Sequence, residues 1–353
     1  MDNRQHGPAT ETHEQFSRPC LTHLNADTSW LLQFPFSKPS DVGRKKFNVL
    51  VDPWFVGSQV DFAPWISEQY HLIPSTVRSI DELEQRLKAE ESDSSVPTGE
   101  HPAARAVTEE HKSFIDAVVI SHEFTDHCNK HTLLEVNPLV PIYATSAAAG
   151  LIRSWKHFAR VHDIPVLTRE NRHRWTGCAV QIAPWLSASR LTSSRDVGYL
   201  HSGVLITYPI SNPQEHGHQE GILYTPHGIV AGDVRWLSDL KPPVNLLALI
   251  HGLHEVSATF LLKINLGAAN GAQLGNFLRA RYWIVTHDEV KDGRGLIGKV
   301  LRRKEWRAEE AQQMQAHHGS PEDSREIGVW PGPSQDPSPM LLSLGSGESL
   351  FLR

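Results

Sequence analysis

Four short apolar segments of the chain each end in side chains that can bind a metal ion. Two of them, Val49-Leu-Val51 and Trp283-Ile-Val-Thr286, are followed directly by an aspartate and a histidine. Strand ends in a protein built of stacked sheets gather along one edge, so ligands that are distant in the sequence can converge there. Neutral imidazole and carboxylate groups suit zinc, iron or manganese. The candidate ligands at the four strand ends are Asp52, His122, Asp126, His127, His227 and His287.

The densest group of candidates lies in the run His122-Glu-Phe-Thr-Asp126-His127. His122 precedes His127 by five residues, a spacing that indicates a turn rather than one face of a helix. The 3 cysteines are scattered, which excludes a thiolate-rich zinc site and a disulfide framework. His251 and His254 follow another apolar segment. They could act as an acid–base pair or contact a substrate, but a lone histidine at a strand end more often has a structural role.

The composition is that of a globular chain with an unusual number of histidines. The 353 residues include 34 Lys and Arg, 40 Asp and Glu and 21 His, which gives a net charge of −6. This length suits two domains or one large α/β domain. The acidic balance provides no basic surface for nucleic acid or anionic lipid. No apolar run approaches the roughly 18 residues of a membrane span, and the polar start lacks a secretory signal, so we expect a cytoplasmic protein.

Hydrophobic patterning predicts an alternation of short strands and helices between polar ends. We expect strands at 28–34, 47–52, 115–120, 141–145, 164–167, 179–183, 203–208, 221–224, 246–250 and 282–286, and helices at 81–87, 132–136, 147–161 and 272–281. Residues 1–20 are expected to form a flexible arm, and the charged, Ser/Pro-rich residues 88–112 a mobile insertion. Residues 306–353 are expected to be a mostly flexible tail, apart from two apolar stretches near its end.

The run from Val118 to Leu133 resembles the signature turn of the metallo-β-lactamase superfamily, which reads His-x-His-x-Asp-His after a buried strand. Three further pieces match in the expected order. A strand ends in Asp52-Pro, Leu-Tyr-Thr-Pro-His227 aligns with Leu-Tyr-x-Gly-Asp, and a last strand presents His287. The resemblance implies an αββα sandwich over residues 21–305, in which two mixed β-sheets pack face to face with helices on the outer faces. The Trp-rich segment after Asp52 is most similar to the lactonase-like and phosphodiesterase-like branches.

The chain departs from the signature at the first of the family's two metal sites. Phe124 stands in place of the second histidine, and no histidine follows the strand that ends at Ala183. His227 stands in place of the bridging aspartate. The resemblance therefore implies one divalent ion, zinc with iron or manganese as alternatives, rather than two. Its ligands would be Asp126, His127, His227 and His287, with a weaker contribution from His122, and Asp52 would orient the histidine turn from outside the ligand set.

Two classes of function follow from this pattern. The first is a metal-dependent hydrolase that opens a small-molecule ester, lactone, thioester or phosphoester through a metal-bound hydroxide, with Asp126, His251 and His254 as catalytic candidates. The alternative is a metal-free relative, either a binding protein or a His-based acid–base isomerase or cyclase. Aromatic residues of the front loop and the signature turn are expected to contact the substrate, although core packing is the other interpretation of such side chains. They are Trp54, Phe55, Trp65 and Phe124.

Overall fold

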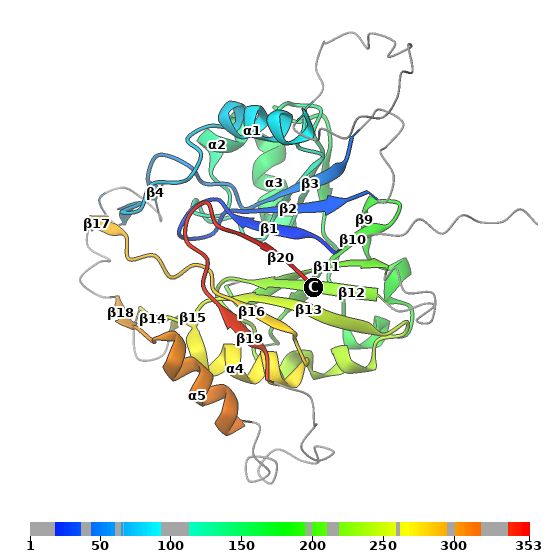
Figure 1. The fold of residues 1–353 in the computed structure, drawn as a ribbon, viewed down its shortest axis with the longest axis vertical. Coiled ribbons are helices and arrows are strands. Elements are labelled where there is room, and N and C mark those ends of the chain that lie inside the picture. Colours follow the sequence, from blue (N-terminus) through cyan, green and yellow to red (C-terminus); the bar gives the residue numbers. More distant parts are fainter. Residues whose placement is uncertain are drawn as a thin grey trace, which may run out of the picture.

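Two seven-stranded sheets form the centre of the protein in the computed structural model. The structure describes residues 18–36, 44–60, 65, 67–92, 113–194, 196, 200–209, 219–258, 262–294, 301–318 and 338–353. The first sheet has the order β20-β1-β2-β3-β6-β7-β8, and the second has the order β19-β16-β13-β12-β11-β10-β9. The two sheets lie face to face, with helices outside both of them (Figure 1). The predicted αββα sandwich is thereby confirmed.

Both sheets are mixed. In the first, β1, β2 and β3 pair antiparallel and β3, β6, β7 and β8 pair parallel. In the second, β9 to β12 pair antiparallel and β12, β13, β16 and β19 pair parallel. The strands of the first sheet are β1 (Cys20–His23), β2 (Trp30–Pro35), β3 (Lys46–Val51), β6 (Ala117–Ile120), β7 (Ile142–Ala144), β8 (Val161–Asp163) and β20 (Ser349–Phe351). Those of the second are β9 (Val180–Ala183), β10 (Leu186–Thr192), β11 (Ser202–Pro209), β12 (Gln219–Thr225), β13 (Val244–His251), β16 (Tyr282–Ile284) and β19 (Met340–Leu342).

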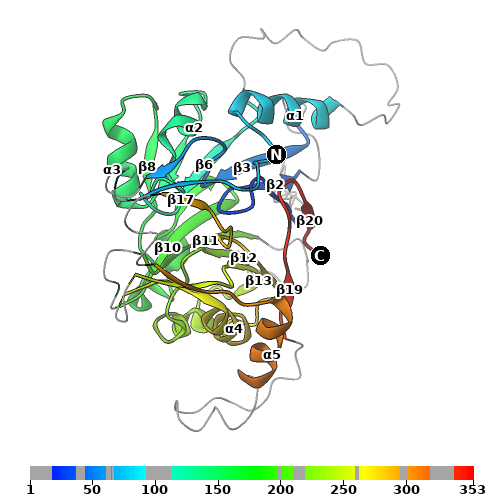
Figure 2. The same ribbon diagram turned by 90° about the vertical axis from the view of Figure 1, so that its left-hand side faces the viewer.

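Helices cover the outer face of each sheet. Figure 2 shows α1, α2 and α3 beyond the first sheet, and α4 and α5 beyond the second. The helices are α1 (Ile80–Ser92), α2 (Lys130–Glu135), α3 (Ser146–Ser154), α4 (Gly267–Phe277) and α5 (Ala308–His318), with 3-10 turns η1 (Arg169–Asn171), η2 (Trp175–Gly177) and η4 (Ala231–Asp239). Two small sheets consist of β4 (Gln59–Val60), β5 (Glu68–Tyr70) and β17 (Asp292–Arg294), and of β14 (Glu255–Ser257), β15 (Lys263–Leu266) and β18 (Arg302–Lys304).

The end of β3, from Val49 to Val51, and the whole of β6 are apolar because both of their faces are covered. In β3 and β6, Val49, Val51 and Val119 face the second sheet, whereas Leu50 and Val118 face the helices. A strand buried on both faces lacks the alternation of apolar and polar residues that marks a half-exposed strand. This explains why the predicted buried segments at 47–52 and 115–120 are strands. It also means that the sites able to carry polar chemistry are at the strand ends.

The boundaries of the ordered domain differ from the sequence-based expectation. The helix α1 continues to Ser92, into the segment predicted as an insertion from residue 88, and the helix predicted at 147–161 ends at Ser154. α5 lies within the predicted tail, whereas β19 and β20 coincide with the two apolar stretches excepted from it and extend the edges of the two sheets by pairing with β16 and β1. They do so because their apolar side chains complete the core. The remainder of the predicted arm, insertion and tail, at 1–17, 93–112 and 319–337, lies outside the described residues.

Among the helices described, none has the length and apolar character needed to cross a membrane.

The C-terminal strand offers a direct test of where the domain ends. Leu352 is 3% exposed and packs in the core between the sheets, whereas its neighbour Phe351 is 65% exposed. We expect Leu352→Ala to lower the free energy of unfolding by about 2–5 kcal/mol, the usual cost of a leucine cavity. Phe351→Ala, the matched control, should change it by less than about 0.5 kcal/mol. Urea unfolding followed by circular dichroism measures both, and equal effects would contradict this placement of the last strand.

Candidate metal centre

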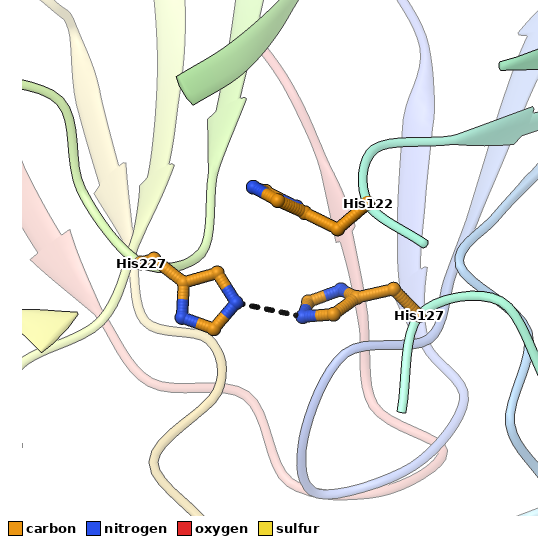
Figure 3. Close-up of side chains that lie close together, drawn as sticks. All are labelled: His122, His127 and His227. Carbon is orange, nitrogen blue, oxygen red and sulfur yellow. Dashed lines mark hydrogen bonds between the residues drawn. The ribbon is translucent and has the colours of Figure 1, made fainter. Parts of the chain in front are cut away.

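The predicted ligands converge where strand ends of the two sheets meet. His122, Asp126 and His127 lie in the turn between β6 and α2, His227 follows β12, and His287 follows β16. All five side chains are buried. Figure 3 shows His122 and His127 from one sheet facing His227 from the other. The convergence arises because β6, β12 and β16 all end at the same side of the sandwich.

The ligand atoms form two overlapping groups that share His127. One contains His122, His127 and His227, the other contains Asp126, His127 and His287, and the ligand atoms within each group lie within 4.8 Å of one another. The Nε2 atoms of His127 and His227 are 3.1 Å apart (Figure 3). Asp126 lies 3.8 Å from the Nε2 of His127 through Oδ1 and 3.8 Å from the Nε2 of His287 through Oδ2.

Three of the histidines are oriented by an acceptor on the far side of the ring. The Nδ1–H of His127 donates to Asp52 Oδ2 at 2.7 Å, and that of His227 donates to Asn265 Oδ1 at 2.8 Å. His287 donates from Nδ1 to Asp27 Oδ1 at 3.0 Å. Each of these hydrogen bonds leaves Nε2 as the atom directed into the cluster. Such an outer partner fixes both the tautomer and the ring orientation of a metal-binding histidine.

Asp52 makes the contacts that a bracing residue requires. Besides His127, its carboxylate accepts hydrogen bonds from the backbone N–H of Ser121 at 2.8 Å and from the Ser121 hydroxyl. The backbone of Asp52 has φ +44°, and that of His287 has φ +58°. Few residues other than glycine adopt this left-handed region, and surrounding contacts must hold them there. For His287 such a contact is its backbone N–H, which donates to the carbonyl of Asp27 at 2.8 Å.

Buried charge at the cluster is not balanced by the protein. Among the described charged side chains that contact the histidines or one another here, Asp27, Asp52 and Asp126 are negative and Lys291 is positive. Burial on its own lowers the pKa of Lys291, but Asp27 and Asp126 more than offset it and raise that pKa. Three carboxylates and one ammonium leave an excess of two negative charges, which a divalent cation would neutralise.

The pKa shifts of His227 and Asp126 favour their metal-binding forms, whereas for His127 burial lowers the pKa but the neighbouring Asp126 and Asp52 outweigh it and raise that pKa. Burial lowers the pKa of His227 well below its usual value, with the neighbouring His287 and His127 acting in the same direction. Burial also opposes charge on Asp126, but His127 and Lys291 outweigh it and lower the pKa of this carboxyl. His227 is therefore neutral and Asp126 ionised near pH 7. These are the protonation states in which imidazole and carboxylate bind metals.

One further observation fits a metal ion. Asp126 Oδ1 is buried without a hydrogen-bond partner. A buried carboxylate oxygen left unpaired is costly, and a cation at the cluster would satisfy it. The donor set of three imidazoles and one carboxylate is one that zinc, iron and manganese accept. The residues present therefore fit a divalent metal ion, with His127 common to both groups of candidate ligands.

His122 differs from the other histidines. Its Nδ1 hydrogen-bonds to the Ser121 hydroxyl at 2.8 Å, and its Nε2 lies 3.0 Å from the carbonyl oxygen of Leu200 and 3.2 Å from Ser202 Oγ. Both ring nitrogens thus take part in hydrogen bonds that tie the turn after β6 to the second sheet. His122 therefore lies in the cluster, but hydrogen bonds to the protein hold both of its ring nitrogens. The predicted weaker contribution of His122 to metal binding has this physical basis.

No protein-family model and no curated protein matches the sequence, but solved structures do. A possible metal-dependent hydrolase from Veillonella parvula DSM 2008 is 11% identical, with a TM-score of 0.53 over 95% of this chain and 100% of that chain. The isothiocyanate hydrolase from Delia radicum gut bacteria is 15% identical, with a TM-score of 0.53 over 94% and 99%. A metallo hydrolase from the hyperthermophilic archaeon Ignicoccus hospitalis KIN4/I is 10% identical, with a TM-score of 0.50 over 95% and 98%.

Each of these matches covers nearly the full length of both chains, so the likeness includes both sheets and their outer helices. The chain has the metallo-β-lactamase fold. At such low identities the likeness establishes the fold, and the chemistry rests on the site. The motifs that carried the sequence resemblance lie in the turns after β6, β12 and β16, which are the turns that contain the candidate ligands.

His251 and His254 do not join the cluster. His251 ends β13, and both of its ring nitrogens are engaged, Nδ1 with the carbonyl of Gly252 at 2.6 Å and Nε2 with Asn270 Oδ1 at 2.9 Å. His254 lies beside Arg303, with its Nδ1 3.2 Å from the Nη1 of the guanidinium. The geometry gives no support to their predicted acid–base role, because neither ring reaches the candidate ligands. In the sequence, His251 and His254 follow an apolar segment just as His227 and His287 do, so this pattern could not distinguish them from the candidate ligands.

The expectation for the front-loop aromatics requires correction. Trp54 is fully buried, with its ring 3.7 Å from that of His71 and 4.9 Å from the Lys291 ammonium, and Phe55 is buried in the core beneath the helices. Both side chains are packed in the core, which is the other interpretation that the sequence allowed for them. Phe124 is half-buried beside His122 and His227, with ring centroids 6.0 Å and 6.1 Å away. Trp65 is 68% exposed, and the residues on both sides of it lie outside the described residues.

Sequence reasoning missed three residues of the centre, Asp27, Asn265 and Lys291. Asp27 lies in the polar turn between β1 and β2, Asn265 is within β15, and Lys291 follows His287 by four residues. None carries a local signal beyond its residue type. A buried polar turn at Asn25-Ala-Asp27 next to an apolar strand is the only hint that the sequence offered.

Asp52 provides a test of the orienting contacts. Asparagine tolerates the left-handed backbone, so Asp52→Asn keeps the turn but removes the charge behind His127. We expect it to weaken zinc binding by about 10- to 100-fold, the usual effect of removing such an outer partner. Asp163→Asn is the control, since Asp163 pairs with Arg153 on the surface. Competition with a zinc indicator dye measures both affinities, and wild-type affinity in Asp52→Asn would rule out the orienting role.

Proposed function

We propose that the chain is a metal-dependent hydrolase of a small-molecule ester, lactone, thioester or phosphoester. The observation that carries this proposal is the convergence of two groups of buried ligand atoms that share His127, one with Asp126 and His287 and the other with His122 and His227. The fold supports it, because the structurally similar proteins from Veillonella parvula and Ignicoccus hospitalis are named as metallohydrolases. The acidic net charge also favours a small substrate over a nucleic acid.

Asp126, His127, His227 and His287 would hold the ion and would leave a coordination position for water or substrate. A bound divalent ion supplies Lewis acidity, which polarises a carbonyl or phosphoryl group and makes water more acidic. His227, kept neutral by burial, offers an Nε2 lone pair, and Asn265 holds its other nitrogen. Asp126 acts as a charged ligand rather than as a proton acceptor, because its pKa is lowered. This assignment replaces the broader catalytic role that the sequence suggested for Asp126.

Phe124 lies at the point where a substrate would approach. The residues from Glu123 to Thr125 are partly exposed, whereas Asp126 and His127 directly after them are buried. The partly exposed Phe124 ring has its centroid 6.0 Å from that of His122 and 6.1 Å from that of His227. An aromatic ring in this position offers apolar contact to the part of a substrate that is not being cleaved. We assign Phe124 this role in place of the histidine found in the family signature.

The proposal is tested by metal content and activity together. The purified protein should retain zinc, iron or manganese after dialysis, and should hydrolyse at least one member of a panel of aryl esters, lactones, thioesters and phosphodiesters. Treatment with a chelator should remove both the ion and the activity, and adding the ion back should restore them. Activity that persists without the ion would favour the metal-free alternative, an acid–base isomerase or cyclase.

A pair of histidine variants makes the test specific to the site. His127→Ala removes the ligand that both groups share, so we expect it to abolish metal retention and lower kcat/KM by at least about 100-fold. His122→Ala should weaken metal binding less, because both ring nitrogens of His122 already take part in hydrogen bonds within the protein. Elemental analysis of the dialysed variants measures the difference. A larger loss in His122→Ala than in His127→Ala would contradict the assigned ligand set.

A further inference from the structure

A buried lysine lies next to the candidate metal centre and is surrounded by oxygen atoms. The ammonium of Lys291 is 2.7 Å from Asp27 Oδ2, 2.9 Å from Gln59 Oε1 and 3.4 Å from Asp126 Oδ2. It also lies 4.9 Å from the ring centroid of Trp54. The side chain of Lys291 is 5% exposed, and those of Asp27 and Asp126 are 1% and 2% exposed. Four segments distant in sequence thus meet around one positive charge.

The two oxygens of Asp126 have different surroundings. Oδ2 faces the Lys291 ammonium, whereas Oδ1 has no hydrogen-bond partner and lies 3.8 Å from the Nε2 of His127. One carboxylate can bind a cation on each oxygen, and this is how a bridging carboxylate serves two-metal sites. In this chain, one of those two positions contains an ammonium. The other lies on the side of His127, the histidine that both groups of candidate ligands share.

We propose that the Lys291 ammonium is a built-in cation that occupies the second cation position of the centre, beside a single exchangeable metal ion. This inference rests on the proposed function, because the first position is the metal site described above. Lys291 would act as a positioning residue. It compensates Asp27, which orients His287, and it reserves Asp126 Oδ1 for the metal ion.

The oxygen atoms around Lys291 indicate what would replace it. Asp27, Gln59 and Asp126 offer two carboxylate oxygens and one amide oxygen, a hard donor set that suits Mn²⁺. Shortening the side chain would leave two buried carboxylates without their cation and vacate the space between them. An uncompensated buried carboxylate either takes up a proton or binds another cation. A divalent ion in the medium is therefore expected to enter.

The experiment measures metal stoichiometry, which is independent of any substrate. Wild type, Lys291→Ala and the control Lys263→Ala are dialysed against Mn²⁺ and then against metal-free buffer, and bound manganese is counted by elemental analysis. Lys263 is an exposed lysine paired with Glu255, so its loss should have no effect. We expect one equivalent in wild type and in Lys263→Ala, and two in Lys291→Ala. One equivalent in a folded Lys291→Ala protein would overturn the proposal.

A second variant covers the case in which Lys291→Ala does not fold. Lys291→Gln fills most of the same space but removes the positive charge. It should therefore bind the single ion at least tenfold more tightly than wild type, because the site becomes more negative. Unchanged affinity in folded Lys291→Gln would overturn the proposal. Absence of metal from wild type but not from Lys291→Ala would refute the proposed function while retaining the role of Lys291, and absence from both would refute both.

Discussion

The centre of this protein depends on how negative charge is compensated where strand ends of the two sheets meet. Asp27, Asp52 and Asp126 are almost completely shielded from water, where an isolated carboxylate is costly. Part of that cost is offset by donors from within the fold, including the Nδ1–H of two histidines, the amide of Ser121 and the ammonium of Lys291. Asp126 Oδ1, which has no hydrogen-bond partner among the described residues, lies on the side that faces His127.

This arrangement depends on the packing of the two sheets. The turn after β6 brings Asp126 and His127 from the first sheet, and the segments after β12 and β16 bring His227 and His287 from the second. Contacts that cross between the sheets hold these turns in register. Thr28 donates to the carbonyl of Asp126 at 2.6 Å, and the hydroxyl of Tyr224 donates to the carbonyl of Thr28 at 3.0 Å. The ligand positions are thus set by the same packing that forms the core.

Asp126 and His127 could be recognised from the sequence because they are neighbours in one turn and belong to a motif of short range. His227 and His287 could be recognised because each directly follows an apolar strand. The same reasoning failed to separate these residues from His251, since a strand end does not reveal where the ring points. It also could not decide between a core and a pocket role for Trp54, because an aromatic side chain in a loop has the same composition in either place, and the structure buries it.

The sequence by itself indicated the αββα layering, through the alternation of short apolar strands with helices and through the resemblance of its ordered motifs to a known superfamily. It also determined the identity of the four candidate ligands and the absence of the signature's second histidine at Phe124. Only the tertiary structure decided which atoms of those ligands face one another, and that Asp27, Asn265 and Lys291 belong to the same centre. The reason is physical: burial, charge compensation and ring orientation arise between segments 38 or more residues apart in the sequence, and no local pattern records them.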